Sequence, residues 1–171
     1  MLSSRLLPIA AACLAACLLR PAAAQPRVTL EMVPTLGGNR SNAAAINDLG
    51  QVTGFALRSD GNSRAFIWQR GTAMRDLGVI AGHAGSVGSG INNLGQVVGY
   101  SDINGDGTAY RAIRWTAATG LQVLAQPAPY NGSLASGIND AGQIVGIGFR
   151  PGNNLDAVVW ATGAPLEVVP S

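Results

Sequence analysis

The chain of 171 residues has no lysine, one histidine and two cysteines, and only 12% of its residues are charged. Both cysteines, Cys13 and Cys17, lie in the first 24 residues, so the rest of the chain has no thiol for a disulfide or a thiolate metal site. With His83 as the only histidine, neither a zinc site of several imidazoles nor a Ser-His-Asp arrangement is recognisable. His83 falls in a predicted loop, where we expect a solvated side chain rather than a catalytic base. The 47% hydrophobic content predicts a soluble chain with a well-filled core.

The first 24 residues have the pattern of a signal peptide. Arg5 precedes an apolar run from Leu6 to Leu19, and small residues follow at Pro21 to Ala24. The run is shorter than the roughly 20 residues that a transmembrane helix needs. Leu14 to Cys17 also resembles the lipobox of bacterial lipoproteins. We therefore expect a secreted protein, extracellular or periplasmic, with a lipid anchor at Cys17 as the alternative.

The charge balance argues against polyanionic partners. Cleavage after Ala24 would remove Arg5 and Arg20, which leaves nine arginines against nine acidic residues. The arginines are scattered, and without a basic stripe the release of counterions that drives nucleic-acid binding is weak. We expect no nucleic-acid partner and no transmembrane helix.

One nine-residue motif occurs three times. It reads INDLGQVTG at residues 46–54, INNLGQVVG at 91–99 and INDAGQIVG at 138–146, with spacings of 45 and 47 residues. The three tryptophans, Trp68, Trp115 and Trp160, also share one repeat position. A fixed period of this length is typical of repeat architectures. We predict a single domain over residues 25–171, with repeats at approximately 41–84, 85–131 and 132–171 and an extra N-terminal strand at 28–36.

Each unit is predicted to contain four short strands. The Asn and Gly of Asn47–Gly50 are typical of a type I turn with a bulge, so a hairpin is expected there. The following strand has apolar residues on both faces in the second and third units, which indicates a sheet covered on two sides. A tryptophan strand and a fourth strand near Leu77 complete the unit. This pattern predicts an all-β fold, a partial β-propeller-like arc of three blades, with a β-sandwich or β-solenoid as alternatives.

Two residue types at fixed repeat positions are expected to be structural. The tryptophans should share a face with Phe66, Ile113 and Val158, two residues before them, and pack in the core between units. Gly54, Gly99 and Gly146 should mark close approach of a neighbouring backbone rather than a phosphate cradle.

The repeated residues resemble a known family. Leu36 to Asn39, Ala45 to Asn47, Gly50 to Val52, Ala65-Phe66 with Trp68, and Asp76 to Gly78 are similar to the HAF-type extracellular repeat family of bacterial secreted proteins. The resemblance implies export and a β-repeat fold of propeller type, and it supplies no catalytic residues. The family motif has a histidine before Ala65. This chain has Arg64 there, and Arg111 and Asp156 in the other units, so a repeated histidine site is excluded.

Three units are fewer than the about four to eight blades of a closed propeller. The end units would then expose apolar faces, which a soluble monomer rarely does. We expect either an open arc capped by its terminal strands or a homodimer that completes a six-blade ring.

One loop has the spacing of a calcium site. Asp102, Asn104 and Asp106 in DINGDG could supply part of the ligands that calcium takes. Ile113 stands at the twelfth position, where an EF-hand has glutamate, so we expect weak affinity. Calcium is the only cofactor that the sequence indicates.

No catalytic residues are predicted from the other carboxylates. Asp48 and Asp140 occupy a turn position that Asn93 fills in the second unit, so turn formation explains them. Loops at 58–63, 102–108 and 150–155 differ between units, and divergent loops on a constant scaffold are where binding usually resides. We therefore expect a non-enzymatic module that binds an extracellular protein or glycan, with a glycan-active enzyme that uses carboxylates as the alternative.

Overall fold

The computed structural model describes residues 28–104, 109–152, 154–161 and 167–168. The predicted signal peptide with Cys17, and Asp106 of the predicted calcium loop, lie outside these residues. Residues 1–31 and 32–171 form two separate units. Of the first unit only residues 28–31 are described, and they form neither helix nor strand.

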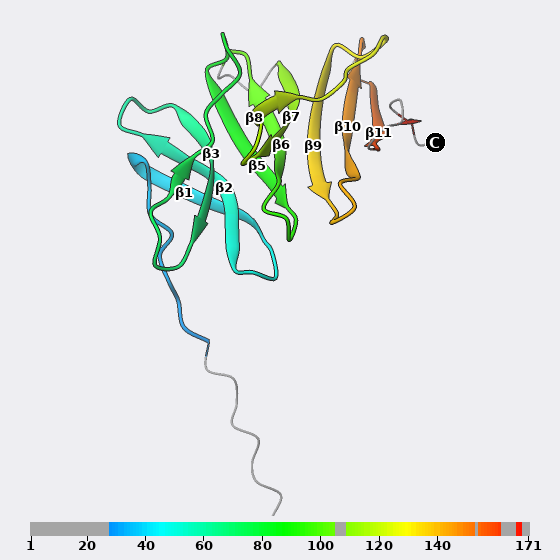
Figure 1. The fold of residues 1–171 in the computed structure, drawn as a ribbon. Helices are drawn as coiled ribbons and strands as arrows, with labels where there is room; N and C mark the ends of the chain where they lie inside the picture. Colours follow the sequence, from blue (N-terminus) through cyan, green and yellow to red (C-terminus); the bar gives the residue numbers. More distant parts are fainter. Residues whose placement is uncertain (1–27, 105–108, 153, 162–166, 169–171) are drawn as a thin grey trace, which may run out of the picture. The chain divides into compact units, whose positions relative to one another are not determined.

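Residues 32–171 contain three four-stranded antiparallel sheets, and the described residues include no helix (Figure 1). Within each sheet, consecutive strands are hydrogen-bonded neighbours, so every sheet is a simple meander. The first sheet contains β1 (Gly37–Ile46), β2 (Gln51–Arg58), β3 (Ser63–Gln69) and β4 (Arg75–Asp76). The second contains β5 (Gly85–Ile91), β6 (Val97–Asp102), β7 (Tyr110–Thr116) and β8 (Gly120–Val123). The third contains β9 (Gly132–Ile138), β10 (Ile144–Arg150), β11 (Asn154–Trp160) and β12 (Glu167–Val168). The all-β prediction is confirmed. Among the described residues no helix is long and apolar enough to cross a membrane.

The repeated turn has the predicted conformation. Asn47 accepts a hydrogen bond from the Gly50 N–H at 3.0 Å and donates its own N–H to the Gln51 carbonyl at 3.0 Å. Gly50 has a φ of 75°, which only glycine adopts without strain. The same two bonds recur in the other units, where Gly95 and Gly142 have φ of 69° and 81°. Local turn chemistry therefore joins the first two strands of each sheet.

The repeated strand glycines lie against a neighbouring backbone, as predicted. A Cβ atom on Gly54 would collide with the Asn42 carbonyl oxygen, and one on Gly99 with the Val87 carbonyl oxygen. In the first two sheets, the strand facing each glycine has a register shift one residue further on. Such a bulge bends the strand and increases its twist. Gly146 meets the Leu134 carbonyl in the same way.

The sheets pack against one another through the tryptophan strands. Trp115 of the second sheet packs in one cluster with Ala65 and Leu77 of the first. Trp160 of the third sheet likewise packs in one cluster with Val98 and Ala112 of the second. Their neighbours Phe66, Ile113 and Val158 are buried as well. Trp115 and Trp160 therefore have the predicted role in the core between units, whereas Trp68 is half-buried and packs in the cluster of its own sheet.

The extra N-terminal strand predicted over residues 28–36 is not formed. Only Leu36 pairs, through a single parallel bridge to Arg58. Pro34 explains part of this difference, because proline has no N–H to donate to a ladder. Val33 and Leu36 nevertheless pack, as Trp68 does, against the buried cluster of Val52, Ala56 and Phe66 in the first sheet, which has no preceding sheet.

Candidate functional site

The repeated turns of the three sheets form a continuous row of polar side chains. The Asn47 side-chain amide donates to the Asn92 carbonyl at 2.9 Å, and the Asn92 amide donates to the Asn139 carbonyl at 3.0 Å. Each asparagine also accepts backbone N–H groups of its own turn, as Asn47 does from Leu49 and Gln51. Asparagine at this repeat position therefore stabilises its own turn, and in the first two units it also bonds the turn of the following unit.

The residues that follow these asparagines form a second row. The Asp48 N–H donates to Asn93 Oδ1 at 2.9 Å, and the Asn93 N–H donates to Asp140 Oδ1 at 2.8 Å. The Asn93 Nδ2 donates to both carboxylates, at 2.9 Å to Asp48 and 3.0 Å to Asp140. Because one nitrogen bonds both, the two nearest carboxylate oxygens lie less than about 6 Å apart. We call these two rows, Asn47, Asp48, Asn92, Asn93, Asn139 and Asp140, the turn ladder.

The turn ladder lines a groove of about 300 Å³. Ile46, Ile91 and Ile138, which precede each turn, complete its lining. Asp48 and Asp140 are exposed, whereas Asn93 is half-buried. The groove thus offers exposed carboxylate acceptors beside an apolar margin, while the amide groups of Asn47, Asn92 and Asn93 each donate twice within the protein.

The sequence correctly predicted these residues to be turn residues but missed that the turns meet. A signal was present, because stacked repeats bring equivalent positions side by side. Three hydrogen-bonding residues at one repeat position were therefore sufficient to predict a row.

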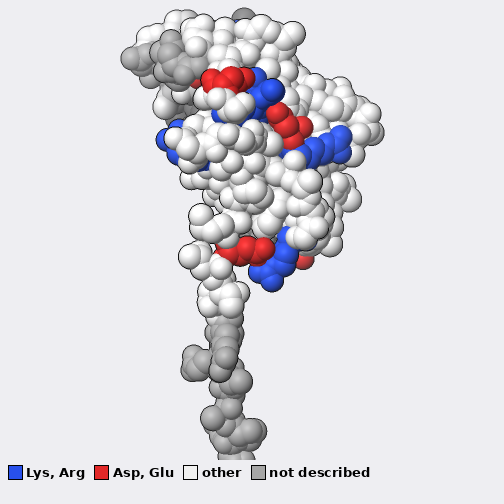
Figure 2. Space-filling model, turned by 90° about the vertical axis from the view of Figure 1, so that its left-hand side faces the viewer, with Lys and Arg blue, Asp and Glu red and all other residues white. Residues whose placement is uncertain are grey.

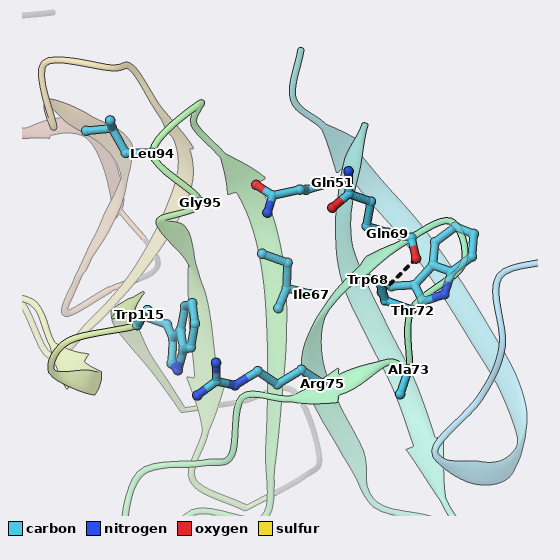
Figure 3. Close-up of a pocket in the computed structure, with 11 residues that line it drawn as sticks. Gln51, Ile67, Trp68, Gln69, Thr72, Ala73, Arg75, Leu94, Gly95 and Trp115 are labelled. Atoms are coloured by element: carbon cyan, nitrogen blue, oxygen red, sulfur yellow. Dashed lines mark hydrogen bonds between the residues drawn. The ribbon is translucent and has the colours of Figure 1, made fainter. Parts of the chain in front are cut away.

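A second groove, of about 310 Å³, lies between the first two sheets (Figure 3). The Arg75 guanidinium lies over the Trp115 ring, 4.8 Å from its centroid. Gln69 donates to the Leu49 carbonyl at 2.9 Å, and Gln51 accepts from the Asn47 amide at 2.8 Å. Since Trp115 is only 6% exposed and faces Arg75, it offers no open ring for a ligand. The polar groups here mainly serve the fold.

In the first two units, an arginine directly before the buried alanine (Ala65 or Ala112) forms a hydrogen bond toward the next sheet. Arg64 donates to the Ala84 carbonyl at 3.0 Å, and Arg111 donates to the Asn131 carbonyl at 2.7 Å. In both cases the acceptor precedes the next sheet. Asp156 in the third unit instead pairs with Arg150 at 2.7 Å and accepts from the Tyr130 hydroxyl at 3.0 Å.

The predicted calcium loop is only partly within the described residues. Asp102 Oδ1 accepts the Asn104 N–H at 3.1 Å, which is a local turn bond. Asp106 lies outside the described residues, and the part of the chain that the structure describes contains no cluster of three or more metal-binding side chains. The calcium site stays a prediction.

His83 lies in a loop, as predicted, but it is not fully solvated. The residue is half-buried, and its Nδ1 atom is buried without a hydrogen-bond partner among the described residues. Because this nitrogen bonds no carboxylate among the described residues, the structure does not place His83 in an acid–base pair.

Charges on the surface are paired rather than gathered by sign. Figure 2 shows the side of the molecule at the first sheet, where most of the surface is uncharged and acidic and basic side chains lie next to each other. Arg58 lies 3.8 Å from Asp60 and 3.7 Å from Asp76. This side therefore has no continuous basic surface for a polyanion.

Comparison with known proteins adds no identification. No family model matches the chain, and no curated protein or solved structure matches it either.

Proposed function

We propose that this protein is a secreted, non-enzymatic β-repeat module that binds a neutral glycan in the groove of the turn ladder. The observation that carries the proposal is that equivalent turns of all three repeats converge on one exposed groove with amide and carboxylate groups. Convergent polar groups in a concave site are the usual mark of ligand binding.

A neutral glycan fits the chemistry of the groove better than an acidic one. Asp48 and Asp140 are exposed acceptors that hydroxyl groups can bond, and they repel anionic groups. A neutral partner also agrees with the balanced charge of residues 25–171. The resemblance to the HAF-type repeat family is part of the same proposal, because it implies an exported protein.

The proposal includes the finer fold. We take the three sheets as successive blades of a partial β-propeller, because each is a four-stranded meander and the second and third each pack their tryptophan face on the preceding sheet. A β-sandwich remains compatible with antiparallel sheets packed face to face. Small-angle scattering of the purified protein would distinguish the two arrangements.

A polysaccharide-binding screen of the purified protein tests the proposed ligand. Asn93→Ala removes the amide that bonds both carboxylates, so we expect it to weaken binding of a neutral glycan about tenfold. Gln122→Ala, in an exposed strand of the middle sheet, is the control and should bind as the unmodified protein does. Absence of binding to every neutral glycan, or equal binding by the Asn93→Ala variant, would contradict the proposal.

A specific observation favours a second candidate, a glycan-active enzyme. Asp48 and Asp140 flank one amide nitrogen, and retaining glycosidases place two carboxyl groups about 5–5.5 Å apart. We expect no turnover, because the two carboxylates have the same bonding partner and nothing distinguishes an acid from a base. Glycan hydrolysis that disappears in Asp48→Asn or Asp140→Asn would establish the enzyme instead.

A further inference from the structure

Among the described residues, the third sheet has no sheet on the face that the first two sheets bury beneath a following sheet, and the first sheet has Val33 and Leu36, rather than a preceding sheet, on its tryptophan face. We propose that a second copy of this chain docks head to tail, so that the third sheet of one copy packs on the first sheet of the other. Two such contacts would close a ring of six sheets, which lies within the about four to eight units of closed propellers. This inference goes beyond the proposed glycan binding and does not depend on it.

The uncovered face of the third sheet is defined by comparing equivalent positions. Thr53 and Val98 share one repeat position, and both are 0% exposed beneath the following sheet. Their counterpart in the third sheet, Val145, is 49% exposed. The pattern repeats one strand further on, where Ala65 and Ala112 are buried and Ala157 is exposed. The third sheet thus has the same face, with no sheet upon it in the described part of the chain.

The first sheet has the other side of such a junction, where an isoleucine packs against the preceding sheet in the second and third units. Ile91 is 8% exposed and packs in the cluster that joins the first and second sheets. Ile138 packs in the same way against the cluster between the second and third. Their counterpart Ile46 is 67% exposed. A head-to-tail contact would bury Ile46 of one copy beside Val145 of the other, as the two internal junctions do.

Hydrogen-bonding groups at the two ends are complementary too. At the internal junctions the Ala65 N–H donates to Ser86 Oγ at 2.9 Å, and the Ala112 N–H donates to Ser133 Oγ at 3.2 Å. Ser41 is the counterpart serine of the first sheet, and its hydroxyl donates to the Val33 carbonyl at 3.0 Å, as Ser86 does to Gly78 at 2.6 Å. Its oxygen is therefore oriented to accept the Ala157 N–H of a second copy.

The turn ladder ends in the same complementary manner. Asn47 and Asn92 each donate twice, once within their own turn and once to the next turn. Among the described residues Asn139 donates only within its turn, to Gln143 at 2.7 Å. Its second N–H is the group that would bond the Asn47 carbonyl of a second copy.

Two differences predict that this contact is weaker than the internal junctions. Asp156 replaces the arginine that bonds the following sheet, so one hydrogen bond is lost. By the pattern of the turn ladder, Asp140 would also face Asp48 of the second copy, whereas each internal step joins an amide to a carboxylate. Two like charges at this distance repel.

The choice of a second copy follows from continuity with the existing interface. An unrelated protein that docked on the third sheet would need a surface like the tryptophan face of the first sheet. A second copy of this chain already has that surface. A head-to-tail contact that does not close would instead generate filaments, because every added copy leaves a new free face.

The test is the mass of the full chain in solution by light scattering coupled to size exclusion, measured across protein concentrations. We expect a dimer that Val145→Arg and Ile46→Arg each dissociate, because an arginine would lie in an apolar contact. Val123→Arg, on the edge strand of the middle sheet, is the matched control and should remain dimeric. All three positions are partly or largely exposed, so thermal unfolding should confirm that each variant folds.

A second experiment mixes the Val145→Arg and Ile46→Arg variants. Each retains the face that the other has lost, so a mixture should form a heterodimer through one intact contact. Asp140→Asn should tighten the dimer by roughly two- to fivefold, since it restores an amide beside each carboxylate. A strict monomer at all concentrations, a dimer that survives both arginine variants, or open-ended filaments would each overturn the proposed ring.

Discussion

Asn92 shows how much one side chain contributes when a repeat places it between neighbours. It is 3% exposed, accepts the backbone N–H groups of Leu94 and Gln96, and donates to Gln96 Oε1 and to the Asn139 carbonyl. An aspartate has the same size but cannot donate. Asn139 occupies the same repeat position, is exposed, and has one donor bond fewer among the described residues.

These two asparagines provide a matched pair of substitutions. Asn92→Asp should lower the free energy of unfolding by roughly 2–4 kcal/mol, because two buried donor bonds are lost and a charge is buried. Asn139→Asp should cost about 1 kcal/mol or less, because its surroundings are solvated. Urea denaturation at neutral pH measures both values. Equal losses would show that the ladder bond between turns contributes little.

Tyr100 supplies a prediction about pH. Burial raises the pKa of its hydroxyl above the ordinary value of about 10, and the charges of Tyr110 and Asp102 raise it further. A raised pKa in the folded state means that folding favours the protonated form. This contribution to stability is therefore complete below about pH 10 and is lost as the pH rises through the folded pKa.

The measurement is the pH dependence of unfolding between neutral pH and strongly alkaline solution. Stability should fall above about pH 10, and it should fall less steeply in Tyr100→Phe, which has no hydroxyl to ionise. Phenolate absorbance should show one tyrosine fewer with a delayed ionisation in the variant. An identical slope in both proteins would show that another group causes the alkaline loss.

At the scale of single elements, the strand glycines determine whether two neighbouring strands can approach closely enough to pair. Gly99→Ala would place a Cβ atom on the Val87 carbonyl, so we expect a loss of about 2 kcal/mol or more. Gly137→Ala is the control, because its Cβ atom would meet only Val145 Cγ2 at 3.5 Å, an ordinary contact. Thermal melting compares the two variants. A small loss of stability in Gly99→Ala would mean that the bulged strand β5 shifts to make room for the added Cβ atom.

The loop after β6 tests the calcium prediction at the same scale. If Asp102 and Asn104 contribute ligands, about 10 mM calcium should raise the melting temperature by a few degrees, and Asp102→Asn should abolish the rise. Asp60→Asn, in the corresponding loop of the first sheet, should leave it unchanged. No shift in the unmodified protein, together with no heat in calorimetry, would exclude a calcium site of useful affinity.

At the scale of the whole molecule, the N-terminal prediction concerns where the protein resides. Expression in a bacterial host should release into the periplasm or medium a chain whose first residue is Gln25, as mass spectrometry would show. A chain that remains with the membrane fraction and carries lipid on Cys17 would support the lipoprotein alternative. A chain that keeps residues 1–24 in the cytoplasm would contradict both.

The positions where sequence reasoning succeeded share a local physical cause. The turn at Asn47–Gly50 depends on the hydrogen bonds of one asparagine and on the positive φ of one glycine. The tryptophans were predicted to lie in the core because three stacked units need equivalent packing positions. The strand predicted at 28–36 is absent because Pro34 has no N–H for a ladder and, among the described residues, only Leu36 has a bridge partner.

The number of repeats, the strands and turns within them, and the glycines at close approach could be predicted from the amino-acid sequence, since these follow from backbone chemistry over a few residues. Which repeat positions are buried and which turns meet depends on how the sheets pack, so neither could be predicted in the same way. Thr53, Val98 and Val145 occupy one position, yet only Val145 is substantially exposed. The reason is physical: burial depends on the neighbouring sheet, and the third sheet has no neighbour on that face among the described residues.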